Sequence, residues 1–407
     1  MQCGLLGKTL GHSYSPQIHS YLGDYPYALF EKKQDKIADF LKNGDFTGLN
    51  VTIPYKKDVI PFCQELTECA KKVGAVNTIV RRSDGSLIGH NTDYYGFYSM
   101  VTRTGLSLAG KKVLVLGSGG ASVTIAAVLQ ELKANVIVVS RSGENNYNNL
   151  HLHTDAAAIV NTTPVGMYPN NGISPVDLDM FPHLEGVLDI IYNPARTQLL
   201  IDAKKRGIPY ENGLWMLIAQ AKESAEWFTG SKIDDKIVGI INNNLRKQME
   251  NIVLIGMPGC GKSTIGKVLA NKLSKQFVDA DAEIERSAQM SIPEIFQKYG
   301  EETFRNLETK ALSDLGKRSG LVIATGGGCV TKAHNYPLLH QNGTIVWIQR
   351  NISKLPTEGR PLSQIGKIEE MYSVRKPLYQ SFSDFCVSNN SSLEETVSQI
   401  MKGYNGI

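Results

Sequence analysis

The sequence predicts an α/β protein of three units, two of which carry a nucleotide-binding loop. Short apolar runs alternate with amphipathic stretches along the chain, a pattern typical of parallel sheets covered by helices. Two of the apolar runs end in glycine-rich loops, at 111–122 and at 251–264. Each loop lies between an expected strand and an expected helix, which is how a nucleotide-binding unit begins. The chain is therefore expected to hold two separate nucleotide sites.

The composition is that of an ordinary globular protein, and it excludes several classes of partner. Hydrophobic residues make up 42% and charged residues 20% of the 407 positions, and the formal net charge is only +4. With charges so nearly balanced, we expect neither nucleic acid nor membrane as a partner. The six cysteines form no C-x-x-C pair, so we expect reduced thiols. The N-terminus lacks the features of a signal peptide and no apolar run could span a bilayer, so we expect a cytoplasmic protein.

The expected units follow the order of the motifs. Residues 1–105 form an α/β unit, which ends with a helix that begins near Asn91. Residues 106–211 carry the first glycine-rich loop and form a Rossmann-like unit. Helices within 212–248 are expected to pack back on the first unit, and a P-loop unit occupies 250–407. Almost no Pro-, Gly- or Ser-rich linker separates the halves, so the junction is short.

The first glycine-rich loop has the G-x-G-x-x-small pattern of dinucleotide-binding loops, in Gly117, Gly119, Gly120 and Ala121. The first glycine makes the turn, and the second lets a pyrophosphate approach the backbone. The next expected strand ends at Arg141, where an NAD enzyme usually carries Asp or Glu. A guanidinium there can bind a 2′-phosphate, so the sequence favours NADP(H) over NAD.

Polar residues in the N-terminal unit suit a polyhydroxylated carboxylate as substrate, because they offer hydroxyls, amides and a single lysine. They are Ser13, Ser15, Thr52, Lys56, Asn77 and Asp93. A buried lysine beside an aspartate can donate a proton to a carbonyl oxygen while a hydride arrives at the carbon. Lys56 and Asp93 are the candidates for this catalytic pair.

Residues 1 to about 245 resemble shikimate dehydrogenases in a series of stretches that follow the family's order. These are GHSYSPQIH, NVTIPYK, GAVNT, NTDYYGF, GSGGAS, NTTPVGM and NGLWMLIAQA. The resemblance implies substrate binding by Ser13, Ser15, Thr52, Asn77, Tyr192 and Gln220. It implies catalysis by Lys56 and Asp93, and places Thr162 and Gly213 near the cofactor. The family usually fits another helix and strand between Ser140 and Asn161, so we expect a shortened cofactor domain.

The second glycine-rich loop is a complete P-loop, G-x-x-x-x-G-K-[ST]. Its residues are Gly256, Gly259, Cys260, Gly261, Lys262, Ser263 and Thr264. In such a loop the backbone amides hold the phosphates of ATP. Lys262 reaches the transferring phosphoryl group, and the Ser263 hydroxyl binds Mg²⁺. We therefore expect a kinase or related enzyme that uses ATP and magnesium.

Further residues of this half suggest how an acceptor is bound. Asp279 and Asp281 end the next expected strand on the same side, so one can support Mg²⁺ while the other orients an attacking hydroxyl. The glycines at 326–328 leave a bare backbone that a small acceptor can approach. Cations for a carboxylate or for phosphates are Arg305, Arg360 and Arg375.

Residues 251 to about 390 resemble shikimate kinases in the order of their D-x-D, F-R-x-x-E, T-G-G-G, R-P-L and R-x-P-L-Y stretches. The resemblance implies that Asp281 contacts the acceptor hydroxyl and that Asp279 supports magnesium. It implies acceptor binding by Arg305, Arg375, Gly326, Gly327 and Gly328, with Glu308 orienting Arg305. Arg360 belongs to a lid and would stabilise the transferring phosphate. The stretch from Gln349 to Gly359 is shorter than the usual lid, and Lys354 is a candidate for its missing basic contact.

Together the resemblances imply two consecutive reactions of aromatic amino acid biosynthesis. NADPH would reduce 3-dehydroshikimate to shikimate, and ATP would then phosphorylate shikimate to shikimate 3-phosphate. Three alternatives stay open: the first half also oxidises quinate, the P-loop half acts on another small acceptor such as gluconate, or one half is a non-catalytic binding domain.

Overall fold

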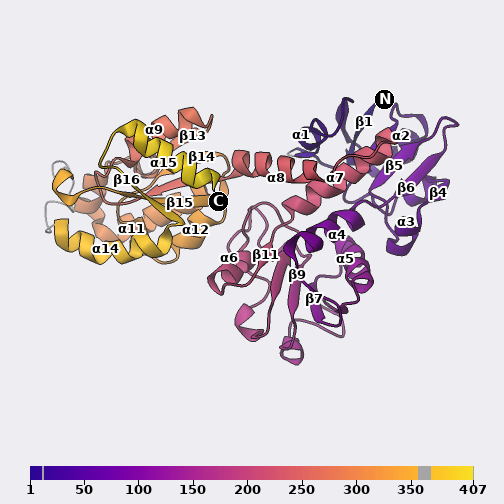
Figure 1. Cartoon of the computed structure of the whole chain (residues 1–407), viewed down its shortest axis with the longest axis horizontal. Helices are drawn as coiled ribbons and strands as arrows, with labels where there is room; N and C mark the ends of the chain where they lie inside the picture. The colour runs from indigo at the N-terminus through magenta and orange to yellow at the C-terminus, as the bar shows by residue number, and fades with distance from the viewer. Residues whose placement is uncertain (12, 356–367, 407) are drawn as a thin grey trace. The chain divides into compact units, whose positions relative to one another are not determined.

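The computed structural model describes residues 1–11, 13–355 and 368–406 (Figure 1). Contacts between Cα atoms divide the chain into two compact units. The first comprises Met1–Val165, Ser174–Tyr192 and Asp202–Asn244, and the second comprises Gly166–Ile173, Asn193–Ile201 and Leu245–Ile407. Each unit contains α/β architecture, as the sequence predicts.

The first sheet of unit 1 has six strands in the order β2-β1-β3-β5-β6-β4. They are β1 Cys3–Gly7, β2 Tyr27–Glu31, β3 Gly48–Val51, β4 Glu65–Leu66, β5 Thr78–Arg81 and β6 Leu87–His90. The expectation of parallel sheets throughout is wrong here, because β5 is antiparallel to both β3 and β6. A tight turn reverses the chain after β5: Gly85 has φ 86°, and Asp84 Oδ1 accepts the backbone N–H of Ser86 at 2.9 Å.

The helices that accompany this sheet come from both ends of unit 1. They are α1 Ser15–His19, α2 Ile37–Asn43, α3 Glu68–Val73, α4 Asp93–Thr104 and α7 Leu214–Thr229, and α8 spans Lys236–Met249. The long helix α7 packs against α4, α1, β3 and β5. Fully buried Leu6, Leu49 and Ile79 lie in the core of the sheet.

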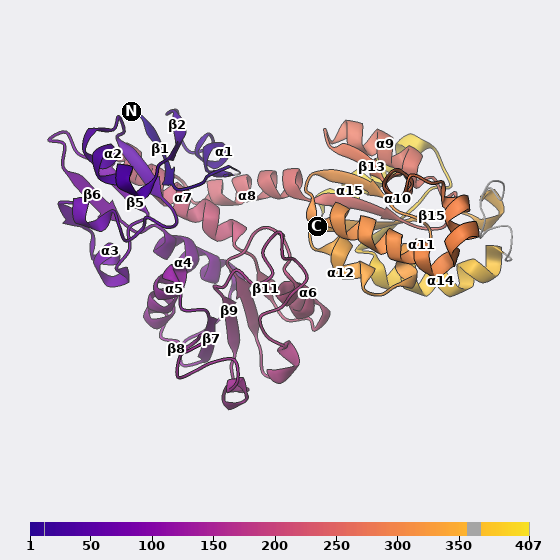
Figure 2. The same ribbon diagram turned by 180° about the vertical axis from the view of Figure 1, so that it is seen from behind.

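The second sheet of unit 1 is parallel, with strand order β11-β10-β9-β7-β8. Its strands are β7 Lys112–Leu116, β8 Asn135–Val139, β9 Ala158–Asn161, β10 Gly186–Asp189 and β11 Tyr210–Glu211. Helix α5 (Gly120–Glu131) follows β7 and lies against β7 and β8 (Figure 2). The helix α6 spans Gln198–Lys205. Between β8 and β9 the chain forms a short 3-10 helix at Leu150–His153, in agreement with the predicted shortening.

The sheet of unit 2 is also parallel, in the order β13-β14-β12-β15-β16. Its strands are β12 Asn251–Ile255, β13 Gln276–Asp279, β14 Leu321–Ala324, β15 Gly343–Gln349 and β16 Phe385–Ser388. Helices lie on both faces: α9 Lys262–Lys272 and α15 Leu393–Asn405 on one, and α11 Ile292–Lys317, α12 Asn335–His340 and α14 Ile368–Phe382 on the other. The helix α10 spans Ala280–Ala288.

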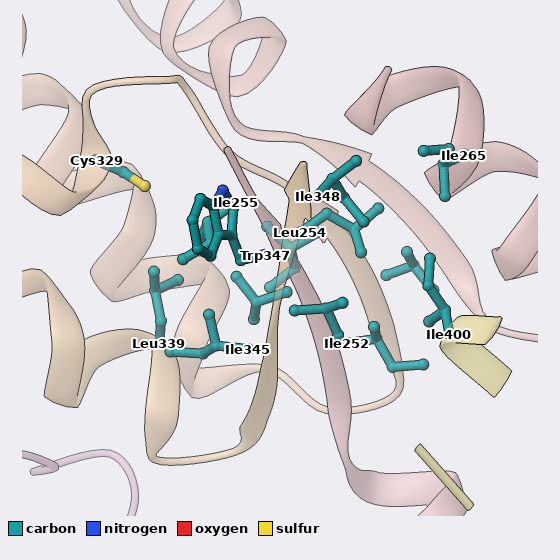
Figure 3. Close-up of a cluster of buried hydrophobic side chains, with 14 of the residues drawn as sticks. Ile252, Leu254, Ile255, Ile265, Cys329, Leu339, Ile345, Trp347, Ile348 and Ile400 are labelled. Carbon is teal, nitrogen blue, oxygen red and sulfur yellow. The ribbon is translucent and has the colours of Figure 1, made fainter. Parts of the chain in front are cut away.

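The centre of this sheet is the core of unit 2. Ile252 and Leu254 of β12 and Ile345 and Ile348 of β15 are buried side by side (Figure 3). Strands covered on both faces are apolar throughout, which explains the continuous apolar runs in the sequence. The carboxyl ends of parallel strands meet at one edge, so the segments that follow β12, β13, β14 and β15 are brought together there.

Candidate active sites

The predicted pair of Lys56 and Asp93 forms in unit 1. Lys56 lies in the turn after β3, and Asp93 is the first residue of α4. Lys56 Nζ donates to Asp93 Oδ2 at 2.6 Å, and the two side chains keep 29% and 17% of their exposure. The pair is therefore close enough to act together and open enough to reach a bound molecule.

Two predicted substrate-binding side chains are fixed beside this pair. Asn77 Oδ1 accepts the backbone N–H of Thr92 at 2.7 Å. Gln220 Oε1 accepts the Thr92 hydroxyl at 3.2 Å. Because Thr92 immediately precedes Asp93, these bonds tie Asn77 of the first sheet and Gln220 of α7 to the start of α4.

Ser224 lies at the centre of the same network and was missed by the sequence analysis. Its hydroxyl accepts from Asn50 Nδ2 at 2.7 Å and lies 3.1 Å from the Thr92 hydroxyl. Ser224 is fully buried. Its spacing of four residues from Gln220 places both on one face of α7, and this signal could have found it.

The two predicted substrate-binding serines, Ser13 and Ser15, lie at the start of α1. Ser13 Oγ accepts the backbone N–H of Ser15 at 3.2 Å, and the rings of Tyr14 and Tyr192 meet edge to face with centroids 6.2 Å apart. The segment after β10 therefore brings Tyr192 next to the serines. Burial raises the pKa of Tyr192, so its hydroxyl stays protonated and can donate a hydrogen bond. Thr52 directly follows β3, and its backbone N–H donates to Leu6 of β1 at 2.9 Å.

The dinucleotide loop fits a pyrophosphate. Gly117 has φ 108°, and a Cβ there would lie 2.8 Å from Thr162 Oγ1, so the predicted neighbours are adjacent. Gly119 precedes the first turn of α5, and a Cβ at Gly119 or Gly120 would meet nothing within 4 Å. A phosphate can thus approach the amides at the start of this helix. These residues fit NADP(H) as cofactor.

The other predicted cofactor residues lie around this loop. Ala121 is half-buried in the first turn of α5, and Arg141 is exposed just after β8. Gly213 precedes α7, and a Cβ there would lie 1.9 Å from the carbonyl oxygen of Ile190. The end of β10 and the start of α7 therefore touch only because residue 213 is glycine.

A cavity of about 530 Å³ lies at the carboxyl edge of the sheet in unit 2. The predicted residues that line it are Gly259, Gly261, Lys262, Ser263, Thr264, Asp279, Asp281, Arg305, Glu308, Gly326, Gly327, Gly328 and Arg375. The Cys260 side chain is fully buried in the hydrophobic core, so only its backbone can serve a ligand. A Cβ at Gly256 would lie 2.5 Å from the Ile348 carbonyl oxygen. Arg360 lies outside the residues that the structure describes.

The phosphate end of this cavity contains the P-loop. The buried Lys262 Nζ donates to the carbonyl oxygens of Gly256 at 2.8 Å and Met257 at 3.1 Å. Ser263 Oγ donates to Asp279 Oδ2 at 2.6 Å. A hydroxyl and a carboxylate this close fit Mg²⁺, which binds through few protein oxygens and completes its shell with waters and phosphates.

Asp281 is the candidate base of the second site. Burial, followed by the negative charges of Asp279 and Glu308, raises its pKa from 3.8 to about 6. Among the described residues its Oδ1 has no hydrogen-bond partner, and the same holds for Glu308 Oε1. A Cβ at Gly326 would lie within 2.8 Å of both oxygens. Glycine at 326 therefore leaves these oxygens accessible to a ligand.

Arg305 and Arg375, the two arginines expected to bind the acceptor, are held beside the glycines at 326–328. Arg305 Nη1 donates to the buried Glu308 at 2.8 Å, as expected for an orienting carboxylate. Arg375 Nη1 donates to the Gly327 carbonyl oxygen at 3.1 Å. A Cβ at Gly328 would lie 2.1 Å from Arg305 Nη1, so only glycine leaves this guanidinium in place.

The cavity also contains an arginine that the sequence analysis missed. Arg350, directly after β15, donates from Nη1 to the Gly259 carbonyl oxygen at 3.4 Å and lines the cavity. Lys354, the earlier candidate for a basic contact, is exposed and lies 3.5 Å from the Asn390 carbonyl oxygen. It is not part of the cavity lining, so the structure favours Arg350.

Comparison with known proteins agrees with both sites. Residues 5–79 match the model of the shikimate dehydrogenase substrate binding domain, and residues 258–405 match the shikimate kinase model. A shikimate dehydrogenase (NADP(+)) of Clostridium perfringens is 38% identical over 253 residues, which cover 57% of this chain and 93% of that protein. The chain belongs to the shikimate dehydrogenase family. Since a shikimate kinase domain follows, it is a bifunctional enzyme.

Solved structures resemble the dehydrogenase part. Shikimate 5-dehydrogenase from Thermus thermophilus in complex with NADP(H) and shikimate is 28% identical, with a TM-score of 0.55 over 60% of this chain and 99% of that one. Quinate dehydrogenase from Corynebacterium glutamicum in complex with NAD is 26% identical, with a TM-score of 0.55 over 60% and 98%. Within the described part of the chain, no helix combines the length and apolarity of a membrane span.

Proposed function

We propose that this chain reduces 3-dehydroshikimate to shikimate with NADPH and then phosphorylates shikimate with ATP and Mg²⁺. The observation that carries the proposal is the 2.6 Å contact between Lys56 Nζ and Asp93 Oδ2, beside the amides of Asn77 and Gln220. The kinase domain supports it independently, because its acceptor would be the product of the first reaction.

In the first reaction NADPH supplies the hydride to the ketone carbon. The Lys56 ammonium donates a proton to the ketone oxygen, and Asp93 orients the ammonium. Asn77 and Gln220 orient the ring hydroxyls. Ser13, Ser15, Thr52 and Tyr192 bind the remaining hydroxyl and carboxylate oxygens. Arg141 favours the 2′-phosphate of NADP(H), and the relatives' NADP(+) designation supports this choice.

In the second reaction ATP supplies the phosphoryl group. Asp281 accepts the proton of the attacking shikimate hydroxyl, and Arg305 and Arg375 bind the shikimate carboxylate. Lys262 contacts the transferring phosphoryl group. Ser263 and Asp279 hold the Mg²⁺ that neutralises phosphate charge.

The proposal assigns three functional domains. Residues 1–105, completed by the helices within 212–248, bind 3-dehydroshikimate, and residues 106–211 bind NADP(H). Residues 250–407 form the kinase domain. The strand and helix order of each segment supports this division.

A coupled assay tests the proposal. The full chain is given 3-dehydroshikimate and NADPH, absorbance at the NADPH band is followed, and ATP with Mg²⁺ is then added while ADP and shikimate 3-phosphate are measured. Lys56→Met should abolish only the first signal and Lys262→Met only the second. A half that binds its ligand in a thermal-shift assay but gives no turnover would be a binding domain instead.

A second substrate is favoured by one observation, the similarity to a quinate dehydrogenase. Rates of quinate and shikimate oxidation, each measured with NADP⁺ and with NAD⁺, show which of the two substrates the first half prefers. If the kinase prefers another acceptor such as gluconate, Arg305→Ala will leave that activity unchanged.

A further inference from the structure

The position of Arg350 follows from the packing of two neighbouring strands. β15 pairs with β12 in parallel register, from Asn251 opposite Gly343 to Ile255 opposite Trp347. The P-loop begins directly after β12, and the Ile348 carbonyl oxygen lies against Gly256 so closely that a Cβ there would be 2.5 Å away. The residue that follows β15 therefore emerges beside the P-loop.

The guanidinium of Arg350 is held in place but has donors to spare. Its Nη1 donates to the Gly259 carbonyl oxygen at 3.4 Å, which is a long hydrogen bond. Its Nε is buried and has no hydrogen-bond partner within residues 1–11, 13–355 and 368–406. A guanidinium carries five N–H donors, so several can serve a ligand in the cavity that Arg350 lines.

The charges nearby indicate the chemistry of that ligand. Two of the carboxylates that line the cavity accept hydrogen bonds from other side chains: Asp279 from Ser263, and Glu308 from Arg305. No ion pair of Arg350 with a carboxylate is found in the described part of the chain. A half-buried guanidinium that has no carboxylate partner among the described residues and lies beside a P-loop is suited to phosphate oxygens, which it can bind in a bidentate manner.

We propose that Arg350 is a nucleotide-binding residue that donates hydrogen bonds to the phosphates of ATP and ADP. The proposal rests on the proposed kinase function, because it assigns a further residue to the same nucleotide site. Arg350, directly after β15, would supply the basic contact for which the sequence suggested Lys354. Lys354 lies on the same segment, but its ammonium is exposed and bound to a backbone carbonyl outside the cavity.

The test uses the full chain with Arg350→Ala, Arg350→Lys and the matched control Arg318→Ala, an exposed arginine after α11. ADP binding is measured by calorimetry at low and high salt, and KM is measured for ATP and for shikimate. Loss of a charge-assisted hydrogen bond should weaken ADP binding about tenfold or more in Arg350→Ala. The loss should shrink at high salt, and Arg350→Lys should recover part of the affinity. The KM for shikimate and the dehydrogenase rate should not change.

Several results would overturn the inference. These are an ADP affinity in Arg350→Ala equal to that of the parent, an equal loss in Arg318→Ala, or a loss that appears in Lys354→Ala instead. A changed KM for shikimate without a change for ATP would place Arg350 at the acceptor end. The failure of the proposed function has a different signature: the parent chain binds ADP but does not phosphorylate shikimate, and calorimetry of the variants still decides the role of Arg350.

Discussion

Replacing Asp281 with asparagine should stabilise the kinase domain while it removes kinase activity. The raised pKa of this carboxyl means that the folded protein disfavours its charged form. Asparagine has nearly the same shape and carries no charge. The proposed catalytic carboxylate is therefore held at a cost to stability, a compromise common at active sites.

The magnitude follows from the two pKa values. In the unfolded chain the carboxyl titrates near 3.8, and in the folded chain near 6. Below pH 3.8 it is protonated in both states, so the stability that the protonated form provides is fully present. That stability is lost as the pH rises from 3.8 to about 6, because over this range the unfolded state releases its proton while the folded state still holds it. At about 1.36 kcal/mol for each pKa unit, the loss at pH 7.5 is about 3 kcal/mol, and at pH 4.5 it is about 1 kcal/mol.

Urea unfolding of the full chain at pH 7.5 and pH 4.5 measures this difference, with the kinase transition identified by its shift when ADP is added. Asp281→Asn should exceed the parent in free energy of unfolding by up to about 3 kcal/mol at pH 7.5 and by about 1 kcal/mol at pH 4.5. Shikimate phosphorylation should fall about 10²- to 10⁴-fold, as expected when a general base is lost. In the parent, kcat/KM for shikimate should fall below pH of about 6.

Asp314→Asn, at an exposed carboxylate of α11, is the matched control and should change neither quantity. The reasoning is refuted if Asp281→Asn is no more stable than the parent at pH 7.5, or if the difference does not narrow toward pH 4.5. If Asp281→Asn phosphorylates shikimate at the parent rate, Asp281 is not the base. The reasoning about its raised pKa and its effect on stability would still stand.

Three further substitutions test the geometry of the two sites. Ser224→Ala removes the hydroxyl that accepts a 2.7 Å hydrogen bond from the Asn50 amide, so the unfolding free energy should fall by about 1–3 kcal/mol. The KM for 3-dehydroshikimate should rise, and an unchanged KM would argue against a role of the Ser224 hydrogen bonds in positioning the substrate-binding residues. Gly213→Ala should lower the unfolding free energy of the dehydrogenase part by about 1–3 kcal/mol in urea, because its Cβ would lie 1.9 Å from the Ile190 carbonyl oxygen. An unfolding transition equal to that of the parent would show that α7 can shift to make room for the methyl group. Gly328→Ala should raise the KM for shikimate about 10- to 100-fold and leave the KM for ATP unchanged, because it displaces Arg305; an effect on ATP alone would contradict this.

The sequence predicted those parts of the sites that follow from local motifs. The P-loop and the Asp279–Asp281 segment come together because parallel strands bring their carboxyl ends to one edge, so the expectation of a parallel sheet was enough. Lys56 lies in the turn after β3 and Asp93 begins α4, and the fold of unit 1 brings the two side chains within 2.6 Å of each other.

What the sequence could not predict depends on packing between distant segments. The spacing of Ser224 places it on the face of α7 that carries Gln220, but its hydrogen bond with Asn50 depends on the packing of α7 on β3, far from it in the chain. Arg350 looks like any exposed cation after a strand until β15 is known to lie beside β12. The antiparallel β5 has the short apolar run of a parallel strand, since a buried strand of either kind shows no distinguishing period.

The packing of α7 on the first sheet also sets an order for folding during synthesis. Phe228 of α7 covers Gly48 of β3 so closely that a Cβ there would lie 2.3 Å from its ring. On the ribosome, however, the whole sheet from β7 to β11 is made before α7 emerges. At about 5–20 residues per second, synthesis of this sheet takes roughly 5–20 s. During that time the apolar face of β3 and α4 remains exposed, because α7 has not yet been made. The inserted sheet can therefore finish folding before its host, and nascent chains that stop ahead of residue 214 should be the ones that chaperones and proteases recognise.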